Sequence, residues 1–205
     1  MAENVANDAT VGVTAVATDA DGTTNVISYT VTAQSCSSVF TVGSSTGIVT
    51  VADNTAIDYE TATSCTVEVT ATSTDTSTAA TTFTVAVTDV NEVPTLSSAQ
   101  ADVSTAEDAA FTLDISGNFA DVDVGDSLAY SATGMPSTMT MSSAGVLSGT
   151  PLNANVGTHT VIVTATDDGS LSVTDTFIVT VTNTNDAPIV TSAISDATAQ
   201  EDASY

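Results

Sequence analysis

Carboxylates are the side chains of this chain with the clearest capacity for chemistry. The 205 residues include 25 Asp and Glu and no Lys or Arg, so the formal net charge is −25. Because no ion pair with Lys or Arg can form, these carboxylates must be solvated, hydrogen-bonded or bound to cations from outside. Divalent cations bound through oxygen would relieve the self-repulsion of such a chain. The simpler alternative is that the acids only keep the protein soluble.

The acidic residues are spaced in a way that favours chelation. Asp58 and Glu60 are two residues apart, and so are Asp121 and Asp123. In extended backbone, residues i and i+2 project to the same side. Ca²⁺ takes about six to eight oxygens from carboxylates, amides and carbonyls, whereas Mg²⁺ demands a tight octahedral shell. The pattern therefore favours Ca²⁺, with ligands from more than one segment.

The acidic tracts belong to a repeat with a period of 94 residues. Residues 83–94 read F-T-V-A-V-T-D-V-N-E-V-P, and residues 177–188 read F-I-V-T-V-T-N-T-N-D-A-P. A period of this length corresponds to a whole domain, so the sequence predicts a tandem array. We expect domains at 1–92 and 93–187, followed at 188–205 by the opening strand of a further repeat or a donor strand.

The elements that must position these carboxylates are β-strands. Val, Ile, Leu or Phe alternates with Thr, which is typical of strands buried on one face. No segment has a convincing helical period, and turn signals separate the strands. About seven short strands per repeat predict an all-β fold of tandem Greek-key immunoglobulin-like sandwiches. The expected strands are 11–16, 27–31, 66–71, 83–87, 111–115, 128–132, 160–165 and 177–181.

The first repeat resembles a bacterial-type cadherin repeat over residues 3–94. It carries E-N at 3–4, D-A-D at 19–21, I-D-Y-E at 57–60 and D-V-N-E-V-P at 89–94, and a T-G-I hairpin lies within 40–51. The order of these motifs makes the resemblance more specific than any one motif.

The second repeat resembles the dystroglycan-type cadherin-like, or "putative Ig", modules of large bacterial surface adhesins. Its motifs are A-E-D-A-A-F at 106–111, F-A-D-V-D-V-G-D-S-L at 119–128, G-V-L-S-G-T-P at 145–151, V-T-A-T-D-D-G at 163–169 and N-T-N-D-A-P at 183–188. It departs from true cadherins because S-G-T-P stands in place of the acidic D-x-E tripeptide, and Asn183 stands where the first repeat has Asp89.

The cadherin resemblance implies Ca²⁺ ions bound where the first repeat meets the second. The implied ligands are Glu3, Asp58, Glu60, Asp89, Asn91, Glu92, Asp121, Asp123 and Asp167. Weaker candidate ligands are Asp19, Asp21, Asp75, Glu107, Asp126, Asn185 and Asp186. For any single pair, the alternative is a solvated surface acid.

The only two cysteines, Cys36 and Cys65, both lie in the first repeat. A pair confined to one domain favours a disulfide in an oxidising compartment, with two free thiols as the alternative. A metal site is disfavoured, because no further soft ligand accompanies the pair.

Several classes of function are disfavoured by charge and composition. A nucleic acid would be repelled by this polyanionic chain, and no segment is long and apolar enough for membrane insertion. His159 lies at a position that is usually aromatic in the resembling family, and no nucleophile-elbow motif is present. We therefore expect no enzymatic activity.

Three functions are compatible with these features. The leading one is a calcium-rigidified, extracellular or cell-surface module of a bacterial adhesin stalk, whose partners are neighbouring repeats or identical subunits. The second is a calcium-dependent polysaccharide-binding module. The third is a filament subunit: the tail 189–205 carries a surplus opening strand, the first repeat lacks most of its own, and donation of the tail would join molecules.

Overall fold

The computed structural model describes residues 1–20, 26–192 and 201. In this part of the chain the regular structure consists of β-strands and three short 3-10 helices, namely η1 (Asn54–Ala56), η2 (Ser116–Asn118) and η3 (Asn153–Asn155). None of the helices among these residues is long and apolar enough to span a membrane.

Contacts divide the chain into two compact units. The first comprises Met1–Ser97, Phe119–Ala129 and Ala165–Val173, and the second comprises Ser98–Asn118, Tyr130–Thr164 and Thr174–Tyr205. Two loops of the second sequence repeat, at 119–129 and 165–173, therefore pack as part of the first unit. These loops carry three of the implied calcium ligands, so the candidate site lies within one unit.

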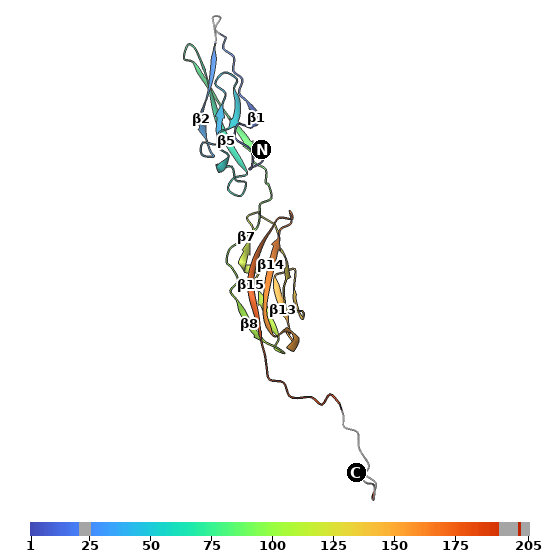
Figure 1. Cartoon of the computed structure of the whole chain (residues 1–205). Helices are drawn as coiled ribbons and strands as arrows, with labels where there is room; N and C mark the ends of the chain where they lie inside the picture. The colour runs from blue at the N-terminus through green and yellow to red at the C-terminus, as the bar shows by residue number, and fades with distance from the viewer. Residues whose placement is uncertain (21–25, 193–200, 202–205) are drawn as a thin grey trace. The chain divides into compact units, whose positions relative to one another are not determined.

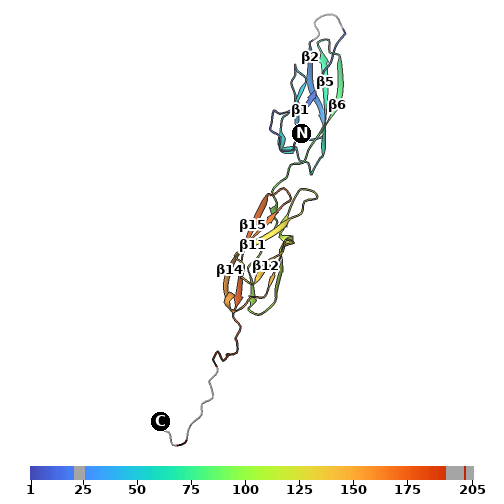
Figure 2. The same ribbon diagram turned by 90° about the vertical axis from the view of Figure 1, so that its right-hand side faces the viewer.

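The first unit contains two antiparallel three-stranded sheets. One has the order β1-β4-β3, and the other has the order β2-β5-β6. The adjacent strands β2 and β5 can be followed in Figure 1, and β5 and β6 in Figure 2. The strand bounds are β1 (Thr10–Thr14), β2 (Ile27–Gln34), β3 (Phe40–Val42), β4 (Ile48–Val51), β5 (Ser64–Ser73) and β6 (Thr78–Ala86).

Alternating side chains build the core of this unit. On β5, Cys65, Val67 and Val69 are buried, whereas the intervening Thr66 and Glu68 face outward. Buried residues from the other sheet complete the core, among them Phe40, Val49 and Val51. Because the side-chain period of a strand is two, the Val-Thr alternation is enough to put the apolar face inside.

Most of the second repeat's strands form two further sheets, with the orders β12-β13-β9 and β11-β14-β15-β8. Strand β8 runs parallel to β15, and Val179 pairs with Val103. The bounds are β8 (Val103–Ala106), β9 (Phe111–Asp114), β11 (Ala129–Thr133), β12 (Met139–Met141), β13 (Val146–Gly149), β14 (Gly157–Thr166) and β15 (Ser172–Thr182). A short antiparallel pair of strands, β7 (Thr95–Leu96) and β10 (Phe119–Ala120), belongs to the first unit.

The predicted all-β sandwich fold is confirmed. Each of the eight expected strand ranges overlaps an observed strand, and the observed ends differ by a few residues. The expected opening strand at 188–205 falls largely outside the described residues, and residues 188–192 form no strand. The domain boundaries at 92 and 187 stay a prediction.

Cys36 and Cys65 form a disulfide across a sequence separation of 29 residues, and the side chain of Cys65 is buried. A cross-link that closes a loop of this length stabilises the folded state by about 3 kcal/mol, because it restricts the unfolded chain. We expect the double variant Cys36→Ala/Cys65→Ala to lose about that much free energy of unfolding in urea titrations followed by circular dichroism. Reductant should lower the urea midpoint of the wild type similarly; an unchanged midpoint would contradict the prediction.

Candidate metal centre

Glu3 connects three segments of the first unit through hydrogen bonds. Its carboxylate is buried, with 6% of the residue exposed. Oε1 accepts a hydrogen bond from the Val90 amide at 2.6 Å, and Oε2 accepts one from the Tyr59 amide at 2.7 Å. The parallel bridge between Ala2 and Thr88 holds the N-terminal segment beside the chain that leaves β6. Glu3 therefore binds the loop 57–60 and the acidic segment 89–92 to the N-terminal segment.

The loop at 57–60 is set by local hydrogen bonds. Ile57 is buried and anchors the start of the loop. Asp58 Oδ1 accepts from the Thr61 amide at 3.1 Å, and Asp58 Oδ2 accepts from the Thr61 hydroxyl at 2.9 Å. The hydrogen bond from the Thr61 hydroxyl, followed by that from the Thr61 amide, lowers the pKa of Asp58. Glu3, Asp58 and Glu60 each place a carboxylate oxygen within 4.8 Å of the others.

A second group of four carboxylates meets around the acidic segment that follows β6. Glu60, Asp89, Glu92 and Asp123 each offer one oxygen, and these oxygens lie within 4.8 Å of one another. The Glu92 amide donates to Asp123 Oδ2 at 2.9 Å, which fixes Asp123 against the segment 89–92. This contact joins residues 31 positions apart in the sequence.

A third group lies in the loop that follows β10. Asp121, Asp123 and Asp126 bring carboxylate oxygens within 4.8 Å of one another, and the Asp123 amide donates to Asp121 Oδ1 at 3.1 Å. Asp123 belongs to this group and to the second, and Glu60 belongs to the second and to the first. The three groups therefore form one continuous set of eight acids, which we call the acidic cluster: Glu3, Asp58, Glu60, Asp89, Glu92, Asp121, Asp123 and Asp126.

Asn91 and Asp167 lie next to this cluster. Asn91 Nδ2 donates to Asp167 Oδ2 at 3.0 Å and to the Glu92 carbonyl at 3.2 Å. Asp167 is buried, and its Oδ1 accepts from the Leu171 amide at 2.8 Å. The turn at 167–171 is thus closed by one oxygen of Asp167 and tied to the acidic segment by the other.

Electrostatic repulsion is concentrated in the cluster. Partial desolvation, and then the neighbouring Asp123, raise the pKa of Glu92 to about 7. Partial desolvation followed by like charges also raises the pKa of Glu60, Asp89 and Asp126. Carboxylates held this close cannot all ionise without cost, and the chain has no Lys or Arg to neutralise them.

The donor set fits a hard divalent cation. Four carboxylate oxygens of the cluster are buried and accept no hydrogen bond from the residues that the structure describes, namely Glu60 Oε1, Glu92 Oε2, Asp121 Oδ2 and Asp123 Oδ1. A buried anionic oxygen without a partner is costly, and buried charges are normally paired or coordinate metals. Ligands that are all oxygen select Ca²⁺, Mg²⁺ or Mn²⁺ over softer metals.

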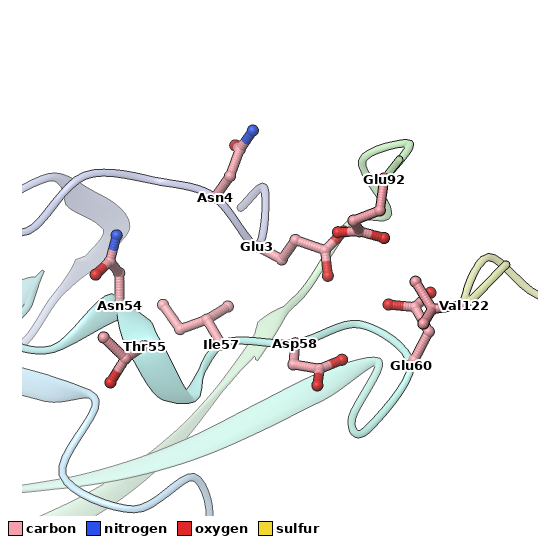
Figure 3. A pocket seen from close by; sticks show the side chains of 9 residues that line it. All are labelled: Glu3, Asn4, Asn54, Thr55, Ile57, Asp58, Glu60, Glu92 and Val122. Atoms are coloured by element: carbon pink, nitrogen blue, oxygen red, sulfur yellow. The ribbon is translucent and has the colours of Figure 1, made fainter. Parts of the chain in front are cut away.

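Part of the cluster faces an open cavity of about 520 Å³. Figure 3 shows the side chains of Glu3, Glu92, Asp58 and Glu60 at this cavity, contributed by the N-terminal segment, the acidic segment and the loop 57–60. Its remaining lining residues are Asn4, Asn54, Thr55, Ile57 and Val122. The cavity offers solvent and ions an approach to the first two carboxylate groups.

The weaker candidates do not assemble in the same way. Asp19 lines a separate hollow of about 160 Å³, Asp75 accepts from the Ser77 amide at 2.9 Å, and Asp21 lies outside the described residues. Among the described residues, none of Asp19, Asp75, Glu107 and Asp186 belongs to a group of three or more carboxylate, imidazole or thiol ligands. Of the weaker Asp and Glu candidates that lie in the described part of the chain, Asp126 alone joins one of the groups.

Two further residues of the site could not be recognised from the sequence. Asn54 lines the cavity, and its Nδ2 donates to the Val5 carbonyl at 2.9 Å, a contact 49 positions apart. Gly169 lies against the side chain of Asn91. Asn54 does not stand out by type or spacing, and although Gly169 ends the motif at 163–169, that motif does not reveal its contact with Asn91.

The fold and the acidic cluster define a protein of immunoglobulin-like β-sandwich domains with a candidate metal centre. Residues 1–90 match the family model for the Cadherin domain, and residues 93–182 match the family model described as "Putative Ig domain". The two matches lie in tandem, a Cadherin domain followed by a domain of this Ig family. Cadherin domains in general bind calcium and mediate adhesion.

Solved structures share this fold. Mouse Cadherin-23 EC22-24 is 22% identical with a TM-score of 0.68, and the match covers 90% of this chain and 62% of that one. Drosophila N-cadherin EC1-4 is 24% identical with a TM-score of 0.69, and the match covers 89% of this chain and 46% of that one. The chain thus spans less than two thirds of either structure. No curated protein sequence matches it.

Proposed function

We propose that this chain is a calcium-binding tandem-repeat segment of an extracellular adhesin or stalk, of the kind found on bacterial surfaces. The observation that carries the proposal is the acidic cluster, in which three overlapping carboxylate groups contain four buried oxygens without hydrogen-bond donors among the described residues. The cadherin family of the first 90 residues supports the choice of Ca²⁺ as the ion.

The ligands fall into sets that follow the three carboxylate groups. Glu3, Asp58 and Glu60 would hold an ion on the side of the loop 57–60. Asp89 and Glu92 would share ions with Glu60 and Asp123. Asp121 and Asp123 would hold an ion in the loop after β10, with Asp126 as an added ligand, and Asn91 and Asp167 complete the proposed set beside them.

The bound ions would supply the positive charge that the chain itself lacks. The segment 89–94 makes no β-ladder, so its position depends on side chains such as Glu3, Asn91 and Asp123. With Ca²⁺ present, attraction to the ions replaces repulsion among these carboxylates. The connection between the repeats then becomes stiff, which suits a stalk whose partners are neighbouring repeats or identical subunits.

Calorimetric titration of Ca²⁺ into metal-free protein tests the proposal. We expect more than one ion to bind, and Mg²⁺ at the same concentration to compete weakly because its octahedral shell is hard to satisfy with this donor set. Absence of binding at millimolar Ca²⁺ would refute the proposal. Calcium-dependent binding to polysaccharide is the alternative to adhesion between proteins, and pull-down on insoluble polysaccharides with and without chelator separates the two.

A second candidate function is assembly into a filament by donation of the C-terminal strand, favoured by the edge of β6. Strands β6 and β15 correspond in the two repeats. In the second repeat, the parallel strand β8 pairs with Val179–Thr182 of β15. In the first repeat, β5 is the only ladder partner of β6 among the described residues, so the other edge of β6 has no paired strand there. Most residues of β6 are exposed. A donated strand would complete this edge. Deleting 189–205 should abolish any polymer, and a polymer that survives the deletion rules out strand donation.

A further inference from the structure

The side chain of Asn91 lies directly over the Cα atom of Gly169. A methyl group built at Gly169 would collide with Oδ1, Cγ and Nδ2 of Asn91, so no residue with a side chain fits there while Asn91 keeps its place. Both residues belong to the first compact unit, although 78 positions separate them in the sequence.

Backbone conformation does not account for a glycine at this position. The φ angle of Gly169 is outside the left-handed region, where glycine would be favoured, and the residue is exposed. An alanine would therefore be tolerated by the backbone and by solvent. The three atoms nearest to the added methyl all belong to Asn91, and this contact is the main obstacle to a side chain.

The position of Asn91 matters for the acidic cluster. Its Nδ2 donates to buried Asp167 and to the Glu92 carbonyl, and the next amide, that of Glu92, donates to Asp123. Because the amide nitrogen is engaged by Asp167, the carboxamide oxygen is held in one orientation. Displacement of Asn91 would remove a donor from Asp167 and loosen the segment that presents Glu92.

We propose that Gly169 is a positioning residue for calcium: it leaves room for Asn91 to lie against the turn 167–171, where the Asn91 side-chain amide donates to Asp167 and to the Glu92 carbonyl and so holds the segment that presents Glu92. This inference rests on the proposed calcium function and adds a residue that ligates nothing. A methyl at 169 would push aside one flexible side chain, so the ion affinity should change much more than the fold.

The test compares Gly169→Ala with Gly117→Ala. Gly117 is a matched control, because it is also exposed, has no left-handed φ, and a methyl there meets nothing within 4 Å. In calorimetric Ca²⁺ titrations of the full chain, we expect Gly169→Ala to weaken binding by about tenfold, as for other residues that orient metal ligands, and Gly117→Ala to leave it unchanged. The two variants should melt at similar temperatures in chelator.

Asn91→Ala shows whether the effect passes through Asn91. If it does, adding Gly169→Ala to Asn91→Ala changes the Ca²⁺ affinity no further. Wild-type affinity in Gly169→Ala, or an undiminished tenfold loss in the Asn91→Ala background, would overturn the inference.

The side-chain amide signals of Asn91 in NMR spectra separate this inference from the calcium proposal. In chelator, Gly169→Ala should shift these signals and Gly117→Ala should not, whether or not the wild type binds Ca²⁺. Unshifted signals would overturn the placement of Asn91 on Gly169. If the signals shift but the wild type binds no Ca²⁺, the proposed function is refuted, and so is the role of Gly169 in positioning for calcium. The contact between Asn91 and Gly169 would still be supported.

Discussion

Chelation of Ca²⁺ should lower the melting temperature of this protein by about 10 °C or more. An ion that binds only the folded state stabilises it by about 2.7 kcal/mol when its free concentration is 100 times Kd, and 1 kcal/mol shifts the melting temperature of a domain of this size by about 4–8 °C. The acidic cluster also destabilises the metal-free fold, because its carboxylates repel one another and partial desolvation raises the pKa of Glu92 to about 7. Scanning calorimetry in excess Ca²⁺ and in excess chelator measures the difference.

Two controls make this result specific to bound calcium. NaCl at matched ionic strength screens charges without coordinating them, so it should restore only part of the lost stability. Small-angle scattering on the same samples reports whether the connection between the repeats loosens without Ca²⁺. Equal melting temperatures in Ca²⁺ and in chelator would mean that the acidic cluster holds no stabilising ion.

Asp123→Asn should change stability in opposite directions with and without calcium. Asp123 belongs to two of the three carboxylate groups, and its Oδ2 accepts from the Glu92 amide. Asparagine preserves the shape and one acceptor oxygen but removes a charge that faces Glu60, Asp89 and Glu92. In chelator the variant should therefore melt above the wild type, whereas its Ca²⁺ affinity should fall by at least about tenfold, or about 1.4 kcal/mol.

The matched control for this variant is Asp8→Asn. Asp8 is an exposed acid outside all three groups, and its φ of 66° is one that asparagine tolerates. This control removes one negative charge, as Asp123→Asn does, but from outside the cluster, so it should leave both the melting temperature in chelator and the Ca²⁺ affinity nearly unchanged. If Asp123→Asn instead melts lower in chelator and binds Ca²⁺ like the wild type, Asp123 acts only as a hydrogen-bond acceptor for Glu92.

The local sequence pattern is enough to predict the β-strands and the kind of metal ligand, which is a carboxylate oxygen. Strands such as β5 and β14 could be predicted because Val and Thr alternate with the period of the pleat, and that period alone assigns each side chain to a face. The 94-residue repeat predicted a tandem array, and the resemblance of the motifs implied a cadherin repeat followed by a putative-Ig module; the matched families agree with that resemblance. The absence of Lys and Arg meant that neutralisation of the carboxylates had to come from outside the chain.

The local sequence pattern could not predict which carboxylates come together in the acidic cluster. Asp126 shares a group with Asp123, whereas Glu107 and Asp186 carry similar local motifs and join no group among the described residues. Glu3 reaches Val90 across 87 positions. Spacing along one strand predicts which oxygens share a side, but distances between loops depend on how the sheets and turns pack.

Residue types and their periodicity were thus sufficient to predict the fold class and the repeat, and they favour an oxygen-ligated cation, because each of these inferences depends on chemistry within a few neighbouring residues. The junction of Glu60, Glu92 and Asp123, and the fit of Asn91 on Gly169, appear only in the folded chain. They arise from contacts between loops tens of positions apart, where a single methyl group decides whether one side chain can reach its place.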